Sequence, residues 1–157
     1  MKKTVLLLTI VLCSFVFCQS QTFKIGATFG LPSADASDIS DFVVGADLYY
    51  YFTDIDDFIN IGATVGFRNF FVDFGPLKDA QFVPLAAAGR LKIFDAIGAG
   101  ADVGYSFGLK DYLDGGFYFR PVVFWDILDT IELNLSYENV SDIVTWGYFN
   151  VGALIQF

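Results

Sequence analysis

The side chains that could do chemistry are few, and most are charged groups set within apolar segments. The chain contains no histidine, which excludes nucleophilic catalysis by a Ser–His pair. Asp56 and Asp57 are adjacent carboxylates that could bind calcium, but no acidic stretch has the spacing and turn glycine of an EF-hand loop. Solvated turn charges are the simpler interpretation of this pair. We therefore expect no enzymatic activity, no cofactor and no bound metal.

A set of charged residues shares one feature: each lies on the polar face of a segment in which apolar and polar residues alternate. The set comprises Lys24, Asp47, Arg68, Arg90, Lys92, Asp102, Arg120, Glu132 and Glu138. No Lys, Arg, Asp or Glu falls on the apolar face of these segments. Ions in a confined interior are tolerated when they are paired. Counting register across neighbouring segments predicts three pairs: Arg90 with Asp102, Arg120 with Glu138, and Lys24 with Asp47.

Eight alternating segments position these charges, and each has the period of two that defines a β-strand with unlike faces. The predicted strands are 22–31, 42–52, 58–68, 81–93, 97–108, 117–126, 131–138 and 146–157. Nearly all are long enough to cross a bilayer at a tilt, which takes roughly 9 to 11 residues. The connections alternate between long and short. This pattern predicts an all-β fold, an eight-stranded antiparallel up-and-down transmembrane β-barrel.

The composition of the chain and of the two strand faces indicates that the apolar face meets lipid and that the polar face lines the interior. Hydrophobic residues make up 55% of the chain, yet no run after the first 20 residues is long enough for a spanning helix. Glycines crowd the polar face, as expected where side chains share a narrow interior. Aromatic residues gather near both ends of the apolar face, as in the girdles of membrane barrels. A soluble, lipocalin-like barrel is the rival interpretation, but it would coat its outside with solvated charges.

The first 20 residues have the features of a secretory signal peptide, cleaved after Cys18 or after Ser20. Either cut removes both cysteines, so we expect a barrel domain over 21–157 with no disulfide. Either cut also removes two lysines and no acid, which makes the net charge of −9 more negative. This charge weighs against nucleic acid as a partner.

The chain ends in a strand with one apolar face, formed by Phe149, Val151, Ala153, Ile155 and the terminal Phe157. Such an ending is similar to the C-terminal strand by which outer-membrane barrels are recognised by their assembly machinery. With the leader and the eight strands, the chain resembles the small OmpA/OmpX-like outer-membrane β-barrel family. The resemblance implies a location in the outer membrane of a Gram-negative bacterium, with outer-membrane lipid and the barrel assembly machinery as partners.

Two functions stay open at this point. The first is a non-enzymatic structural or surface-interaction barrel, whose interior charges form a plug and whose loops 32–41 and 69–80 contact an extracellular partner. The second is a narrow porin-like channel for small solutes or ions. Pro84 and Pro121 lie inside predicted strands, where a closed barrel has no edge to accommodate a missing N–H, so we expect bulges there.

Overall fold

The computed structural model describes residues 21–38, 40–55, 58–72, 79–141 and 145–157. The predicted signal peptide and the Asp56–Asp57 pair lie outside these residues. The strands are β1 Thr22–Ser33, β2 Ser40–Ile55, β3 Ile59–Val72, β4 Ala80–Lys92, β5 Ile97–Gly108, β6 Gly116–Leu128, β7 Ile131–Ser141 and β8 Thr145–Gln156, and a short 3₁₀ helix, η1, spans Ala34–Asp38. Among the described residues, no helix is long and apolar enough to cross a membrane.

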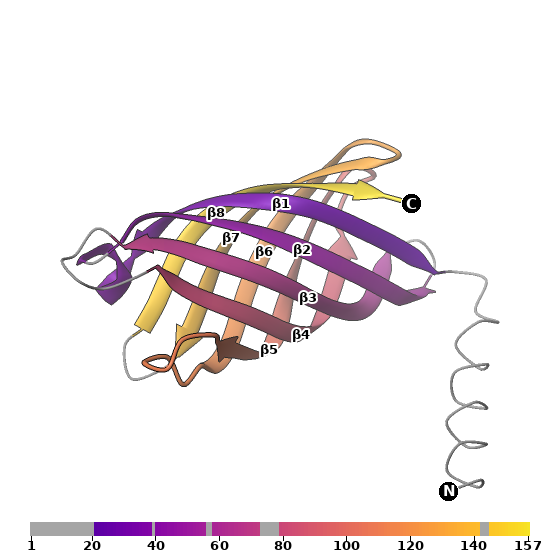
Figure 1. Cartoon of the computed structure of the whole chain (residues 1–157). Helices are drawn as coiled ribbons and strands as arrows, with labels where there is room; N and C mark the ends of the chain where they lie inside the picture. Colours follow the sequence, from indigo (N-terminus) through magenta and orange to yellow (C-terminus); the bar gives the residue numbers. More distant parts are fainter. Residues whose placement is uncertain (1–20, 39, 56–57, 73–78, 142–144) are drawn as a thin grey trace, which may run out of the picture.

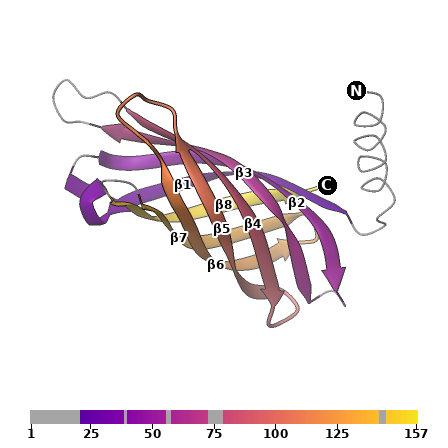
Figure 2. The ribbon, with the colours of Figure 1, turned by 90° about the horizontal axis from the view of Figure 1, so that it is seen from below.

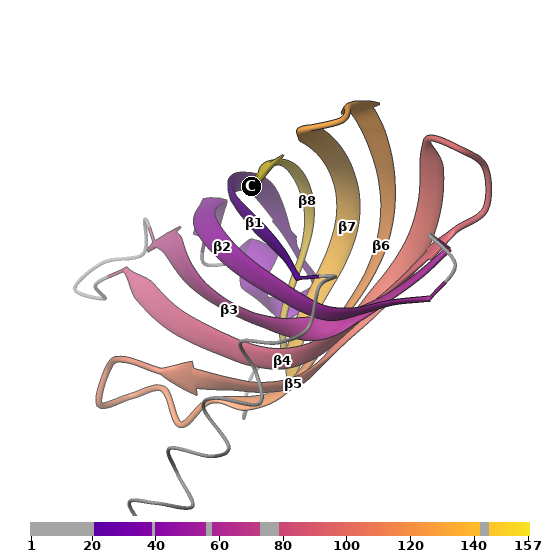
Figure 3. The same cartoon turned by 90° about the vertical axis from the view of Figure 1, so that its right-hand side faces the viewer.

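Each strand pairs antiparallel with its neighbour in the sequence, and β1 pairs with β8 to close the sheet. This topology confirms the predicted eight-stranded antiparallel up-and-down barrel. Figure 3 shows the strands wrapping around a common interior, and Figure 2 shows their tilt to the barrel axis. Closure matters energetically because it leaves no edge strand in the described barrel, so unpaired ladder groups are limited to local gaps.

The two ends of the barrel differ. At one end, β1 begins and β8 ends, and the turns 93–96 and 129–130 are short; η1 and the connection 109–115 lie at the other end (Figure 1). We call these the short-turn end and the loop end. The last two strands are longer than predicted at the loop end, since β7 continues to Ser141 and β8 already begins at Thr145.

The strands alternate in burial as the sequence pattern predicts. In β8, Phe149, Val151 and Ile155 are exposed on the outer surface, whereas Tyr148 and Leu154 are buried in the interior. The same alternation runs through the other strands, so the apolar face points outward throughout.

Rings of aromatic residues meet on the outer surface near both ends. Towards the loop end, Phe42 stacks on Phe71 with ring centroids 4.5 Å apart. Towards the short-turn end, the ring of Tyr50 lies 4.7 Å from Phe23 and 6.4 Å from Phe52. These contacts agree with the two girdles expected from the sequence.

The prediction of bulges at Pro84 and Pro121 is wrong. Pro84 pairs with Ser106, and Pro121 pairs with Ala101, in an unbroken register with β5. On its other side each proline faces a gap of two residue pairs, after which the pairing resumes in the same register. The missing N–H therefore opens one ladder locally, while the other neighbour keeps the strand aligned. Register shifts occur instead in β2 and near the end of β6.

Candidate functional site

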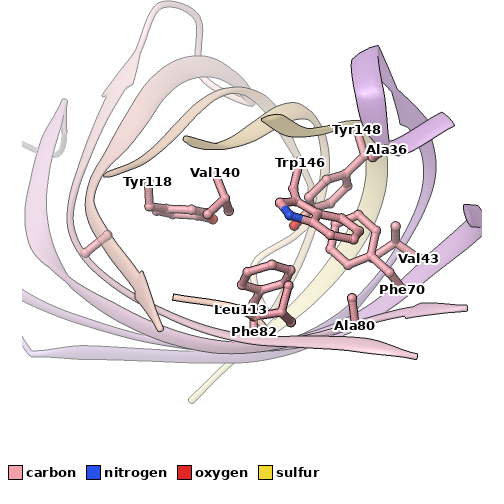
Figure 4. Packing of buried hydrophobic residues seen from close by; sticks show 11 residues of the cluster. Ala36, Val43, Phe70, Ala80, Phe82, Leu113, Tyr118, Val140, Trp146 and Tyr148 are labelled. Carbon is pink, nitrogen blue, oxygen red and sulfur yellow. The ribbon is translucent and has the colours of Figure 1, made fainter. Parts of the chain in front are cut away.

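The interior of the barrel is the candidate site, and it is layered along the barrel axis. Nearest the loop end lies an aromatic cluster in which the ring of Phe70 packs 5.0 Å from Trp146, 5.1 Å from Tyr148 and 5.7 Å from Phe82 (Figure 4). Leu113, from the connection 109–115, packs against the same cluster. The cluster is completed by Ala36 of η1 and by Val43, Ala80, Ala86, Tyr118 and Val140. Residues of both described loop-end connections thus cover this layer.

Phe70 corrects part of the sequence interpretation, which placed residues 69–80 in a loop. The structure extends β3 to Val72, and this gives Phe70 the inward position two residues after Arg68. Its side chain is fully buried and packs in the aromatic cluster, so it is not displayed on the surface of the barrel. Residues 73–78 of the predicted loop lie outside the described residues.

Below the aromatic cluster lies a network of charged side chains, which we call the central network. It comprises Asp47, Arg68, Arg90, Asp102, Arg120 and Glu138. All six come from inward positions of β2 to β7, and each is at most 5% exposed. Burial of so many ions is stable only when each finds an opposite charge and hydrogen-bond partners.

Arg68 joins opposite walls of the barrel. Its Nη2 donates to Oδ1 of Asp47 at 2.8 Å, and its Nε donates to Oε2 of Glu138 at 3.0 Å. Glu138 also accepts hydrogen bonds from the hydroxyls of Tyr118 and Tyr148 and from the amide of Asn150. Glu138 is therefore the acceptor on which four other side chains converge.

Arg120 occupies the middle of the network. Its Nη1 donates to Oδ2 of Asp47 at 2.9 Å and to the hydroxyl of Tyr49 at 2.7 Å. Its Nε lies 3.3 Å from Oε1 of Glu138, as the predicted pairing requires, and donates to Ser136 at 2.8 Å. Arg120 thus links two carboxylates that belong to different strands.

Arg90 pairs with Asp102 as register counting predicts, with Nη1 at 2.6 Å from Oδ1. The two residues are two positions out of direct register, since Arg90 faces Gly100 and Asp102 faces Ala88. The absent side chain at Gly100 leaves room for the backbone of β4 and for the Arg90 side chain, because a Cβ there would lie 2.1 Å from the carbonyl oxygen of Gly89 and 2.8 Å from Cδ of Arg90.

Two further ion pairs lie towards the short-turn end. Lys24 Nζ contacts Oε2 of Glu132 at 2.6 Å, and Lys92 Nζ contacts Oδ2 of Asp126 at 3.1 Å. The Lys92 pair is the more accessible, with side-chain exposures of 33% and 21%.

The expected pairing of Lys24 with Asp47 is wrong. The register sets Lys24 opposite Tyr49, and Asp47 opposite Gly26. Both oxygens of Asp47 are already occupied by arginines, so the lysine extends to Glu132 instead. All nine charged residues of the predicted set nevertheless lie on the inward face.

Glycines beside the network make room for Arg68. A Cβ at Gly45 would lie 2.7 Å from Cδ of Arg68, and a Cβ at Gly66 would lie 2.5 Å from Oδ1 of Asp47. Both distances are too short for a real contact, so larger residues would displace the ion pair. This geometry agrees with the expectation that inward glycines create space for large side chains.

The sequence analysis did not identify the uncharged side chains that hydrogen-bond to the central network. Tyr49, Tyr118 and Tyr148 donate to its carboxylates, and Asn134 accepts from Nη2 of Arg120 at 3.1 Å. Their inward parity was visible in the sequence. The alternation of inward and outward positions does not determine which polar groups meet across the lumen, because those contacts depend on the curvature of the closed sheet.

The terminal strand completes the barrel wall. Phe149, Val151 and Ile155 are between 49% and 60% exposed on the outer surface, and the backbone N–H of Phe157 donates to the carbonyl of Phe23 at 2.9 Å. In the part of the chain that the structure describes, no group of His, Cys, Asp and Glu could hold a metal ion.

No protein-family model matches the sequence, and no curated protein matches it. Solved structures do match. Ail of Yersinia pestis aligns with a TM-score of 0.62 and 13% identity, over 87% of this chain and 97% of its own. The N-terminal β-barrel domain of Pseudomonas aeruginosa OprF aligns with a TM-score of 0.61 and 11% identity over the same shares.

Neisserial surface protein A aligns with a TM-score of 0.52 and 12% identity, again over 87% of this chain and 97% of its own. The chain has the fold of the small OmpA/OmpX-like outer-membrane barrels. At these identities the likeness extends to the fold alone. Ail has also been solved with the heparin analogue sucrose octasulfate, in a structure that aligns with a TM-score of 0.51 and 17% identity over 87% of this chain and 97% of its own.

Proposed function

We propose that this protein is a non-enzymatic barrel of a Gram-negative outer membrane, with a plugged lumen and a structural or surface-interaction role carried by its loop end. The observation that carries the proposal is the burial of Arg68 and Arg120, whose side chains are each 1% exposed. Both cross the lumen to reach carboxylates on other strands. An ion could pass only if these bonds broke.

Charge balance supports a plug over a selective pore. The buried cations Arg68, Arg90 and Arg120 and the half-buried Lys24 are matched by the buried anions Asp47, Asp102, Glu132 and Glu138. A pore selective for one sign of ion is lined by an excess of the opposite sign. The aromatic cluster adds a second, apolar barrier on the loop side of the network.

The outer surface supports the membrane location. Large apolar residues such as Phe29, Leu135 and Val151 are 54–58% exposed there. Soluble monomers rarely expose a continuous apolar surface of this kind, whereas hydrocarbon accommodates it. On this reasoning the short-turn end faces the periplasm and the loop end faces outward.

The loop end is negatively charged, and this charge limits the kind of extracellular partner that it could bind. Its described connections and strand ends carry the acids Asp35, Asp38, Asp41, Asp79, Asp111 and Asp114 against one base, Lys110. Like charges repel, so a polyanion of the kind solved with Ail is a poor fit for this surface. We propose a cationic or neutral surface as the partner.

Epitope insertions test the orientation and the surface role. One tag is inserted after Asp111, at the loop end, and a matched tag after Asp129, at the short-turn end. The proposal expects antibody to label intact cells through the first tag, and to reach the second only after the outer membrane is permeabilised. Labelling of intact cells through the Asp129 tag alone would reverse the orientation and refute the surface role of the loop end.

One feature of the short-turn end favours the alternative function, a narrow channel. The Lys92–Asp126 pair is partly exposed, so solvent reaches into the lumen from that side. The path meets the central network before it reaches the loop end. We therefore rank the channel second.

A further inference from the structure

Two adjoining hollows lie on the outer, apolar wall formed by β5 to β8, which are consecutive strands of the sheet (Figure 1). One hollow, of about 360 Å³, is lined by side chains that include Trp125 and Leu133. The other, of about 370 Å³, includes Ala99. Val123 and Leu135 line both hollows, so the two form one continuous trough, which we call the outer groove.

Small outward residues create the outer groove. The outward side chains at Ala99 and Ala101 of β5 are single methyl groups, and Ala101 pairs with Pro121 of β6. The pairing of β6 with β7 is open at Pro121, and this proline lines the groove. On the loop side the rings of Tyr137 and Phe149, with centroids 4.8 Å apart, border the hollow. The groove is therefore a depression between taller side chains.

The outer groove lies towards the short-turn end of the wall. Its lining on β6 comprises residues 121–125, and this strand ends at Leu128. On β7 the lining runs from Leu133 to Tyr137, which spans roughly 13 Å along an extended strand. The hydrocarbon core of a bilayer is about 30 Å thick, so this length is close to the depth of one leaflet. In the orientation proposed above, on which this inference rests, that leaflet faces the periplasm.

A hydrocarbon chain fits the outer groove better than a second copy of the barrel. A stable protein interface buries about 800 Å² on each partner over a broad, complementary surface. The wall of a second barrel is convex, so it would bridge a narrow trough without filling it. Each hollow instead has the size of a small-ligand pocket, about 300–1,000 Å³, and its described lining carries no charged side chain.

A polar pocket of about 310 Å³ lies at the rim of the barrel, directly beyond the outer groove; we call it the rim pocket. Ala96 and Asp126 line the rim pocket, and their chain neighbours Ile97 and Trp125 line the groove. The backbone N–H of Asp126 donates to the carbonyl of Ala96 at 2.7 Å, which holds the two strands together at this border. The groove and the rim pocket are thus adjacent.

The charge of the rim pocket selects among lipid headgroups. The pocket carries the carboxylates of Asp95, Asp126 and Asp129 against the single ammonium group of Lys92. A headgroup with an amine complements this excess of negative charge, and Lys92 complements its phosphate. A headgroup with a net negative charge is repelled by the same carboxylates.

We propose that the outer groove binds an acyl chain of a phospholipid from the periplasmic leaflet, and that the rim pocket selects a zwitterionic amine headgroup over an anionic one. Phosphatidylethanolamine has this chemistry, whereas phosphatidylglycerol is anionic. The barrel thereby holds one kind of lipid at one position on its wall, in addition to the general contact of its apolar surface with hydrocarbon.

Trp125 reports on the occupant, because it lines the groove and the other tryptophan, Trp146, is only 4% exposed in the interior. The wild-type barrel is reconstituted in equimolar phosphatidylethanolamine and phosphatidylglycerol, and one lipid at a time carries bromine on its acyl chains to quench nearby tryptophan. We expect the quenching to show about a two- to fivefold enrichment of phosphatidylethanolamine at Trp125, the range set by one exposed ion pair. Equal quenching by the two lipids, or stronger quenching by phosphatidylglycerol, would overturn the proposal.

A matched reporter on the opposite wall separates the groove from the bulk bilayer. In the double variant Trp125→Phe with Phe52→Trp, the lipid-facing tryptophan lies on β2, towards the same end of the barrel. We expect no enrichment of either lipid there. The same preference at both positions would show that the groove is not a distinct site. Absence of quenching at both positions would instead show that the barrel is not inserted, which refutes the proposed membrane location itself.

Filling the groove tests whether the hollow itself holds the acyl chain. Ala99→Phe places a ring in the groove and should abolish the enrichment at Trp125, whereas Ala63→Phe, at an exposed position of β3 outside the groove, should preserve it. Heat-dependent migration on SDS gels first shows that both variants fold. Enrichment that survives Ala99→Phe contradicts the proposal. Protection of Trp125 from both lipids, together with the mass of a dimer in sedimentation, would identify a second copy as the occupant and overturn it.

Discussion

Replacing Glu138 with glutamine is the most informative perturbation of the central network. The carboxylate of Glu138 accepts from Nε and Nη2 of Arg68, each at 3.0 Å, and from the hydroxyl of Tyr118 at 2.9 Å. A glutamine keeps one acceptor oxygen but turns an NH₂ group towards these donors. It also leaves Asp47 as the carboxylate that contacts both Arg68 and Arg120, with Asp102 4.0 Å from Nη1 of Arg120.

The size of the effect follows from burial. Removing one partner of a fully buried ion pair costs about 3–5 kcal/mol, because the other charge is left uncompensated. With a urea dependence of about 1–3 kcal/mol per molar, a loss of about 3–5 kcal/mol lowers the unfolding midpoint by roughly 2 M. Glu138 is fully buried, so solvent screening does not reduce this figure.

The assay is urea unfolding of the barrel folded in micelles, followed by tryptophan fluorescence. Asp126→Asn is the matched control, because its partly exposed pair with Lys92 contributes at most about 1 kcal/mol. The double variant Glu138→Gln with Arg68→Gln restores neutrality and should recover part of the loss. Equal midpoints for Glu138→Gln and Asp126→Asn, or strict additivity in the double variant, would refute the reasoning.

Three further predictions follow from the barrel wall. The folded protein should resist SDS until it is boiled, because its ladder closes on itself; identical gel migration before and after boiling would contradict this. Deleting Phe157 should impair assembly in cells more than refolding in vitro, because in vitro the deletion removes only one backbone hydrogen bond, to Phe23. Equal losses of folded protein in cells and in vitro would show that the assembly machinery does not recognise Phe157. Gly66→Ala should destabilise the barrel by about 1–3 kcal/mol, because the added methyl group displaces Asp47. Gly89→Ala is the control and should not destabilise the barrel, because a Cβ there meets nothing closer than 4.0 Å. Equal urea midpoints for the two variants would refute the packing argument.

Much of the fold was predictable from sequence because a strand has a period of two. Parity placed Arg90, Asp102 and the other charges on one face, and near-neighbour register then paired Arg90 with Asp102 across a single hairpin. Local spacing sufficed for this hairpin but not for every pair of adjacent strands, since Lys24 does not pair with Asp47 across β1 and β2 and the Arg68–Asp47 pair across β2 and β3 was not predicted.

Pairs across the lumen were not predictable in this way. Lys24 bonds Glu132, which lies two strands away through the β1–β8 closure, and Arg68 reaches Glu138 on the opposite wall. Both contacts depend on the diameter and tilt of the closed sheet, which strand parity does not encode. Phe70 was misplaced for a different reason: its run of aromatics resembles an interface loop, yet β3 continues through it.

Single-channel recording of the wild-type barrel in planar bilayers distinguishes a plugged lumen from a channel. We expect no stable conductance, because the central network and the aromatic cluster fill the lumen between its two ends. Replacing Arg120 and Glu138 together with alanine should weaken the network and raise the leak above that baseline. A large, stable wild-type conductance that is unchanged by Arg120→Ala would contradict the plug and establish the barrel as a channel.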